Sequence, residues 1–397
     1  MRKATLAFVF VLVAMDVMAM GIVIPVLPKL VERFEGGDTA RAAEMFGAMN
    51  TAWGVMQFLF MPVLGMLSDR FGRRPVILIS CAGLGLDYFV MALAPTLGWL
   101  FAGRVISGIT AASMSTAFAY ITDVTPPEKR AGAFGIMGAA FGVGFVIGPA
   151  LGGLLGGIDP RLPFWVAGVL ALVNAAYGFF VLPESLAVEK RAKFALKRAN
   201  PVGSLNLLRS HPELFGLALV LFIMNLAHYV LPAVAVLYMG FRYGWGELAV
   251  GLVLAGVGIC AMIVQGGLVR KVVPKIGERR ALALGLSFGA IGFFMYGLAP
   301  TGLLFLAAIP VMSLWGFAMP AAQAIMTRHV SVSEQGQLQG ANASLTSLAG
   351  IFAPALFSQI FSATLLTVPG AAFMLAGTLL LLAMAIGLRV TRPMMHP

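Results

Sequence analysis

Four ionisable side chains lie within stretches that are otherwise apolar, and a fifth ends one such stretch: Asp16, Asp87, Arg104, His228 and, at the end, Asp123. A charge at the centre of a bilayer costs at least about 2.5–3.5 kcal/mol, so such groups pair or face an aqueous cavity. Asp16 follows Lys3 by 13 residues, which is roughly 20 Å along a helix, and Asp87 reaches a similar depth. A carboxyl at this depth can alternate between a protonated state and a ligand-binding state.

Arg104 approaches the same depth from the opposite side, five residues after Trp99. A guanidinium stays protonated, so we expect it to tune a carboxylate or hold backbone carbonyls rather than deliver a proton. Asp16, Asp87 and Arg104 are therefore the predicted proton-coupling residues. A static ion pair between Asp16 and Arg104 and a structural, hydrogen-bonded Asp87 remain alternatives. For His228 a packing or hydrogen-bonding role is favoured over a proton relay.

The composition identifies the elements that must position these groups. Of 397 residues, 60% are apolar and 11% charged, against about 45–50% and about 25% in soluble domains. A membrane-spanning helix needs about 20 apolar residues, so the chain holds enough for about twelve. This excludes a water-soluble enzyme, and the sequence shows no nucleophile–base pair, HExxH motif or phosphate loop. The net charge of +11 forms no folded basic patch, so nucleic acid is not expected as a partner.

Apolar runs and the Pro, Gly and charged residues between them predict an all-α integral membrane protein. Asp16 lies inside the first run, and no small-x-small cleavage site follows it, so we interpret this run as a retained helix rather than a signal peptide. The predicted spans are residues 5–31, 43–66, 75–94, 97–122, 130–156, 163–183, 213–240, 247–269, 280–299, 302–327, 335–362 and 368–389.

The distribution of basic residues predicts the orientation of these spans. With the amino terminus inside, 21 of the 27 Lys and Arg fall on the cytoplasmic side, five fall on the other side and Arg104 lies within a helix. This positive-inside bias predicts a multi-pass protein of the cell inner membrane with both termini cytoplasmic. The polar stretch 184–211 is predicted to be a cytoplasmic basic linker. A solvated charge run is favoured there over a specific anionic-lipid site.

Weak internal matches recur at an offset of 205 residues, as in Gly72 with Gly277, Arg74 with Arg279, and 149–151 with 354–356. They predict two pseudo-symmetric six-helix halves, residues 1–183 and 212–397, with a ligand site near mid-membrane. The offset partners of the three proton-coupling residues are Leu221, Gly292 and Ile309. Proton chemistry is therefore expected in the first half.

Residues 65–74, GMLSDRFGRR, match the hallmark loop of the major facilitator superfamily. Residues 138–153, GAAFGVGFVIGPALGG, resemble the fifth-helix motif of its proton-coupled drug antiporters. Asp16 with GIVIPVLP, the run 86–88, and 104–110 resemble the tetracycline/proton antiporters in particular. The resemblance implies the major facilitator fold of twelve transmembrane helices and an exchange of cargo against protons.

The hallmark loop is expected to be a gate rather than a cargo site. Its glycines permit a tight turn, Asp69 can lie at the positive end of a helix, and one of the three arginines can pair with Asp123. A purely topological role for any single arginine remains open. The predicted gating residues are Gly65, Asp69, Arg70, Gly72, Arg73, Arg74 and Asp123.

The fifth span is rich in glycines around one proline. Residues four apart lie on one helix face, so these glycines give small faces for close packing, and the proline kinks the span. Such a helix could block proton leak, although glycines that serve packing alone are an alternative. The residues assigned to this antiporter motif are Gly138, Gly142, Gly144, Gly148, Pro149 and Gly152.

Polar and aromatic positions within other spans are the candidates for cargo binding: Asn50, Gln57, Tyr88, Asn225, His228 and Gln323. Neither Cys81 nor Cys260 indicates a disulfide or a metal site. Tetracycline exporters often carry a His in the eighth helix and an Asp in the ninth. The eighth-helix run here has Ala261 and the ninth has no charge, so no metal is assigned.

These observations together predict a monomeric, proton-coupled efflux antiporter in the lipid bilayer that exports small amphipathic, tetracycline-like drugs. The proton gradient is the energy source, and no cofactor is expected. A sugar or metabolite efflux transporter or a symporter of the same fold is the alternative. A non-transporting membrane protein is disfavoured by the intact loop and by the membrane carboxylates.

Overall fold

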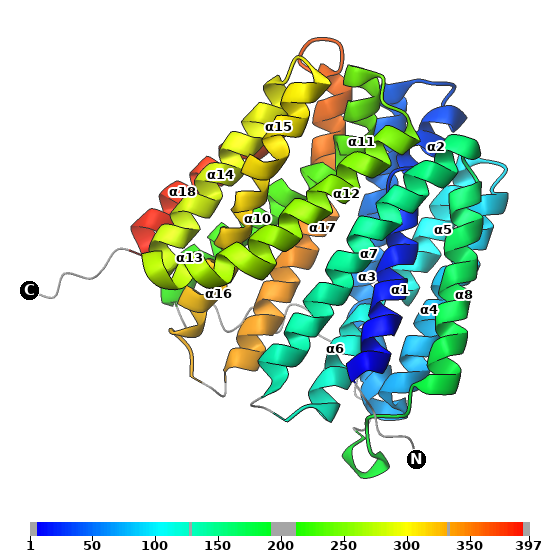
Figure 1. Ribbon diagram of the computed structural model, residues 1–397, viewed down its shortest axis with the longest axis vertical. Helices are drawn as coiled ribbons and strands as arrows, with labels where there is room; N and C mark the ends of the chain where they lie inside the picture. Colours follow the sequence, from blue (N-terminus) through cyan, green and yellow to red (C-terminus); the bar gives the residue numbers. More distant parts are fainter. Residues whose placement is uncertain (1–5, 127–128, 192–211, 332–333, 392–397) are drawn as a thin grey trace, which may run out of the picture. The chain divides into compact units, whose positions relative to one another are not determined.

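A computed structural model describes residues 6–126, 129–191, 212–331 and 334–391 (Figure 1). Within them, twelve helices are long and apolar enough to cross a membrane, and this confirms the predicted all-α membrane architecture. The chain is therefore a multi-pass membrane protein. Most of the predicted linker 184–211 lies outside the described residues.

The first six spans are built from eight helices, because two spans are interrupted. The first span breaks at a turn over residues 24–26, where Pro25 has no N–H to donate, and the fourth breaks at Ala111 and Ala112. The helices are α1 (Leu6–Val23), α2 (Leu27–Phe34), α3 (Thr39–Phe71), α4 (Arg73–Leu93), α5 (Leu97–Thr110), α6 (Ser113–Val124), α7 (Arg130–Ile158) and α8 (Leu162–Val181).

The later spans are interrupted more often. A five-residue π-helix, η5 (Val264–Leu268), lies in the eighth span, and a 3-10 helix, η6 (Leu314–Phe317), lies in the tenth. The remaining helices are α10 (Pro212–His228), α11 (Val230–Tyr243), α12 (Glu247–Ile263), α13 (Val269–Ile276), α14 (Glu278–Leu298), α15 (Gly302–Ser313), α16 (Ala318–Thr327), α17 (Gln335–Thr364) and α18 (Ala371–Val390).

Contacts group the described residues into two compact units. The first comprises Met1–Asp38, Ala52–Asn200 and Trp245–Gly258, and the second comprises Thr39–Thr51, Pro201–Gly244 and Ile259–Pro397. Helices α3 and α12 are therefore each divided between the units. The halves 1–183 and 212–397 were inferred from a repeat along the chain, and they stay a prediction.

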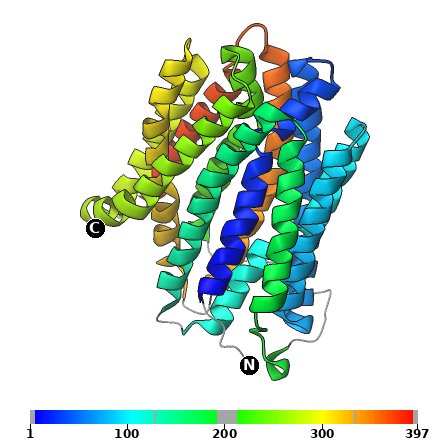
Figure 2. The same cartoon turned by 45° about the vertical axis from the view of Figure 1, so that its right-hand side comes forward.

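In the first unit, α1 packs along α7 and also touches α8 (Figures 1 and 2). Glycines bring the two backbones together: a methyl group at Gly148 would lie 2.8 Å from the Cα of Gly21, and one at Gly144 would lie 2.9 Å from the carbonyl oxygen of Ala14. Lipid gives no hydrophobic driving force between helices, so close van der Waals packing of this kind holds them together.

In the second unit, α14 packs on α18, and α10 packs on α17 and α18. Aromatic rings fill the space between helices: Tyr238 lies 4.9 Å from Phe373 between ring centroids, and Tyr296 lies 4.4 Å from Phe305. The Tyr238 hydroxyl donates to the carbonyl oxygen of Tyr296 at 2.9 Å. This bond satisfies the only polar atom of a fully buried tyrosine side chain.

The close contact of α1 with α7 generates a prediction about stability. Gly148→Val should lower the thermal unfolding temperature of the purified protein, because overpacking at a tight site costs about 1–3 kcal/mol. Gly138→Val is the matched control, since Gly138 lies on the same helix with no neighbouring atom within 4 Å of an added methyl group. Equal destabilisation by the two variants would contradict this account of the contact.

Candidate functional site

The carboxylate of Asp16 lies inside the first unit, where it is only 8% exposed. One oxygen accepts a hydrogen bond from the Ser113 hydroxyl at 2.7 Å, and the other lies 3.8 Å from the Cys81 thiol. Asp16 on α1 therefore connects to α6 and α4. A buried carboxylate with only neutral partners can hold a proton, or it can release that proton and bind another cation in its place.

A second polar residue extends this group toward α8. The fully buried amide nitrogen of Asn174 donates to the carbonyl oxygen of Leu12 at 2.9 Å and lies 3.8 Å from the Cys81 sulfur. The sequence-based predictions did not include Ser113, Asn174 or a polar role for Cys81. Asn174 carries the one available signal, because an amide inside an apolar span needs a partner just as a charge does.

Asp87 on α4 is more deeply buried, at 2% exposure. Among the described residues no hydrogen bond of good geometry reaches either of its oxygens, although the Ser107 hydroxyl lies nearby. Gly103 on α5 leaves room for the carboxylate, since a methyl group there would lie 2.6 Å from the Oδ1 atom.

Arg104 supplies the positive charge that acts on Asp87. Its guanidinium also lies over the ring of Trp53 on α3, 5.2 Å from the centroid. The buried side chain of Tyr88 interacts electrostatically with Asp16, Asp87 and Arg104. The fold thus gathers these four residues, which we call the acidic cluster, within one unit.

The hallmark loop joins α3 to α4, and ion pairs hold it in place. The Arg73 guanidinium donates to Asp69 at 2.5 Å and to Asp123 at the end of α6 at 3.0 Å. Of the three arginines that could pair with Asp123, the structure selects Arg73. Arg74 instead donates to the carbonyl oxygen of Phe179 at 2.5 Å and lies over that ring.

Glu184, beyond the end of α8, is the acceptor that holds this turn. Its carboxylate accepts the backbone N–H groups of Arg73 at 2.8 Å and Arg74 at 3.2 Å, at the start of α4. Gly72 adopts a φ of 108°, which disfavours any residue with a side chain, and the Glu184 carboxylate fills the space where a Cβ would lie. Glu184 was predicted to be only the first residue of a linker.

The predicted cargo residues are divided among several places. Asn225 and Gln323 line one cavity of the second unit, and the ring of His228 lies 5.6 Å from that of Trp315. Tyr88 belongs to the acidic cluster. Asn50 and Gln57 are half-buried on α3.

The antiporter-motif residues on α7 differ in their surroundings. Gly144, Gly148 and Gly152 face α1, and Pro149 lies against Gly21. Gly138 faces open space, and Gly142 is half-buried.

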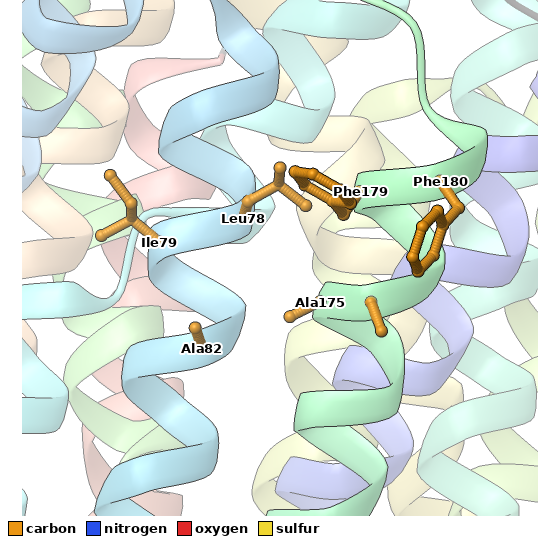
Figure 3. A pocket seen from close by; sticks show the side chains of 7 residues that line it. Leu78, Ile79, Ala82, Ala175, Phe179 and Phe180 are labelled. Carbon is orange, nitrogen blue, oxygen red and sulfur yellow. The ribbon is translucent and has the colours of Figure 1, made fainter.

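A hollow of about 390 Å³ lies between α4 and α8, and Figure 3 shows the side chains that line it. Leu78, Ile79 and Ala82 line one side, and Ala175, Phe179 and Phe180 line the other. Ile79 is 65% exposed and Phe180 75% exposed. This apolar hollow offers no group for proton or cargo chemistry and is typical of a surface that contacts lipid.

Polar pairs connect helices of the two sequence repeats at residues 33 and 247 and at residues 44 and 362. Arg33 beyond the first span binds Glu247 at the start of α12 at 2.6 Å. The Ser362 hydroxyl of α17 donates to Glu44 of α3 at 2.7 Å. Gly251 on α12 lies against Gly153 on α7, and Gly47 on α3 lies against Ser358 on α17. None of these pairs was predicted from the sequence.

Comparison with known proteins identifies a family. The family model of the Major Facilitator Superfamily matches residues 6–354. Tetracycline resistance protein class C of Escherichia coli is 38% identical over 372 residues, covering 94% of this chain and 93% of its own. Tetracycline resistance protein class D of Salmonella ordonez is 34% identical over 395 residues, and the match covers 99% of this chain and 98% of that protein. The crystal structure of the nucleoside transporter NupG superposes with a TM-score of 0.78 at 13% identity, covering 98% of this chain and 99% of that chain.

The chain therefore belongs to the major facilitator superfamily, a family of membrane transporters. Among its members, the tetracycline resistance proteins resemble it along almost the whole chain.

The role of Glu184 generates a prediction about stability. Glu184→Gln should lower the free energy of unfolding by about 1.5–3 kcal/mol, because the amide keeps one neutral acceptor oxygen but loses the second acceptor and the negative charge. Thermal unfolding of the purified protein measures this. Glu189→Gln, an exposed acid in the short helix after α8, is the control. A variant at Glu184 as stable as that control would show that the carboxylate does not hold the turn.

Proposed function

We propose that this protein is a proton-coupled antiporter that exports small amphipathic drugs, tetracycline among them, across the bacterial inner membrane. The named relatives that it matches over nearly its whole length support the drug class. The proton gradient supplies the energy in this proposal, and the protein works as a monomer without a cofactor.

The observation that carries the proposal is the acidic cluster. Asp16 and Asp87 are carboxylates buried in membrane helices, where a negative charge is costly unless a proton or a cation neutralises it. A proton and the cationic part of a drug can each do so, but they exclude one another at the same oxygens. Competition at this site exchanges drug for protons.

Ser113 and Arg104 have separate roles in this exchange. The Ser113 hydroxyl orients the ionised oxygen of Asp16, and it loses a charged acceptor when that oxygen takes a proton. Arg104 holds a fixed positive charge beside Asp87 and so stabilises the ionised form of that carboxylate. Two carboxylates with different neighbours can then release their protons in separate steps.

Alternating access requires that contacts at the two ends of the membrane form and break in turn. In this proposal the Asp69–Arg73–Asp123 group acts at the cytoplasmic end. The Arg33–Glu247 and Glu44–Ser362 pairs act at the outer end, where they connect helices of the two repeats. Cargo taken from the cytoplasm reaches the outside when these outer pairs separate.

Asp16→Asn should abolish uphill tetracycline export, because an amide cannot exchange a proton. Export is measured in proteoliposomes with an imposed pH gradient. The variant should keep the thermal unfolding temperature of the wild type, since the Ser113 hydroxyl still finds an acceptor. Asp38→Asn, at an exposed site between α2 and α3, controls for the substitution. Gradient-driven export by Asp16→Asn at the wild-type rate would remove this residue from the mechanism.

Tetracycline affinity should fall as pH falls, because protonation of Asp16 and Asp87 competes with the drug. The dependence should flatten in Asp16→Asn and Asp87→Asn and persist in His228→Gln, since His228 contacts aromatic rings rather than the acidic cluster. Equilibrium binding across a pH series tests all four proteins. If only His228→Gln flattened the curve, the proton site would belong to α10.

A further inference from the structure

A cavity of about 350 Å³ lies in the second unit, bounded by α10, α16 and α17. Its size is within the range of small-molecule sites, about 300–1,000 Å³. Amides from three helices line it, and none of its lining residues is charged. We call it the amide pocket, and its polar lining residues are Asn225, Gln323, Gln339, Asn342 and Thr346.

Helix periodicity explains why these amides converge. Residues three or four apart lie on one face of a helix. Gln339, Asn342 and Thr346 follow this spacing on α17, as do Leu221 with Asn225 on α10 and Met319 with Gln323 on α16. Each helix thus presents one mixed apolar and polar stripe to the same space.

Asn342 is the unusual member of the pocket. Its side chain is 8% exposed, and neither its amide oxygen nor its amide nitrogen has a hydrogen-bond partner among the described residues. A buried polar group without a partner costs about 1–3 kcal/mol. Folding alone does not favour such an amide at this position, whereas a ligand that satisfies it would.

Two neighbouring polar groups of the pocket already have hydrogen-bond partners. The Asn225 amide nitrogen donates to the carbonyl oxygen of Leu221 at 2.8 Å, and the Thr346 hydroxyl donates to the backbone carbonyl oxygen of Asn342 at 3.0 Å. Asn342, which lines the pocket, thus holds one buried donor group and one buried acceptor that no described residue satisfies.

We propose that the amide pocket is a drug subsite that binds an uncharged donor–acceptor group, a primary carboxamide, through Asn342. The Asn342 nitrogen donates to the carboxamide oxygen, and its oxygen accepts from the carboxamide N–H. Leu221 and Met319 contact the adjoining apolar part of the drug. This inference rests on the proposed export of tetracycline, which carries such a carboxamide.

The lining of the amide pocket also makes the binding of charged drug groups unfavourable. A carboxylate or an ammonium group would be buried here without a counter-charge, at a cost larger than that of an unpaired amide. A divalent cation prefers carboxylate ligands, and this pocket offers none. Charged parts of a cargo are therefore excluded from this subsite.

The test pairs a protein change with a ligand change. Binding of tetracycline, and of its analogue in which a nitrile replaces the carboxamide, is measured by equilibrium titration of the purified full chain without added metal. We expect Asn342→Leu to weaken tetracycline binding about tenfold, or about 1.4 kcal/mol. The wild type should bind the nitrile about tenfold more weakly than tetracycline, and Asn342→Leu should not weaken nitrile binding further.

Gln359→Leu is the matched control, because it removes an exposed amide elsewhere on α17 and should leave both affinities unchanged. If Asn342→Leu does not fold, Gln323→Leu in the same pocket is measured with the same two ligands. Equal loss for tetracycline and nitrile, or loss for neither, would overturn the subsite.

Failure of the export proposal can be distinguished from failure of the subsite. A wild type that discriminates the two ligands through Asn342 but exports no tetracycline in proteoliposomes would support the subsite and overturn the transport proposal. A wild type that binds neither ligand would overturn both.

Discussion

Hydrocarbon cannot hydrogen-bond, and the rest of this structure depends on that constraint. Backbone groups in the membrane must be satisfied within helices, which accounts for the twelve spans. Side chains obey the same constraint: Asp16, Asn174 and Tyr238 all find donors or acceptors on other helices. Several buried polar atoms of the described residues are exceptions, the side-chain oxygen of Asn174 among them. Asp87 and Asn342 each hold two such atoms, and both side chains belong to groups with a proposed ligand.

Close backbone packing fixes the positions of the helices relative to their neighbours. Gly144 and Gly148 allow α7 to contact α1 so closely that the position of Asp16 on α1 is fixed relative to the helices around it. The same device recurs where Gly251 meets Gly153. Polar pairs such as Arg33–Glu247 contribute little free energy when partly exposed. In the proposed cycle such weak pairs suit contacts that break, whereas the glycine contacts between α1 and α7, within one repeat, suit those that persist.

The sequence predicted the spans well, because about twenty consecutive apolar residues are needed to cross a bilayer and few other structures require them. It did not predict the interruptions at Ala111, at η5 or at η6, because an apolar run marks the length of a span and does not distinguish the helix types within it. Among the candidate residues, Asp16, Asp87 and Arg104 were selected by type and depth and Tyr88 as a cargo candidate, and the fold brings the four together.

The remaining residues of the site could not be predicted from periodicity. Ser113 is 97 residues from Asp16, and Asn174 is 162 residues from Leu12. Glu184 is 111 residues from Arg73, in a stretch that resembled a solvated linker. Hydroxyls and amides are also common in membrane helices, so their type alone does not distinguish a partner of Asp16 from a residue that bonds its own helix, as Ser287 does.

The place of Cys81 between Asp16 and Asn174 has a spectroscopic consequence. The thiol is fully buried, and its sulfur lies 3.8 Å from both a carboxylate oxygen and an amide nitrogen. The S–H stretching vibration absorbs in an infrared window clear of amide and water bands, and its frequency depends on the acceptor that the hydrogen meets. The chain has only one other cysteine, Cys260, which is partly exposed. The native protein thus contains a vibrational reporter beside Asp16, readable without any label while the carboxylate gains or loses its charge.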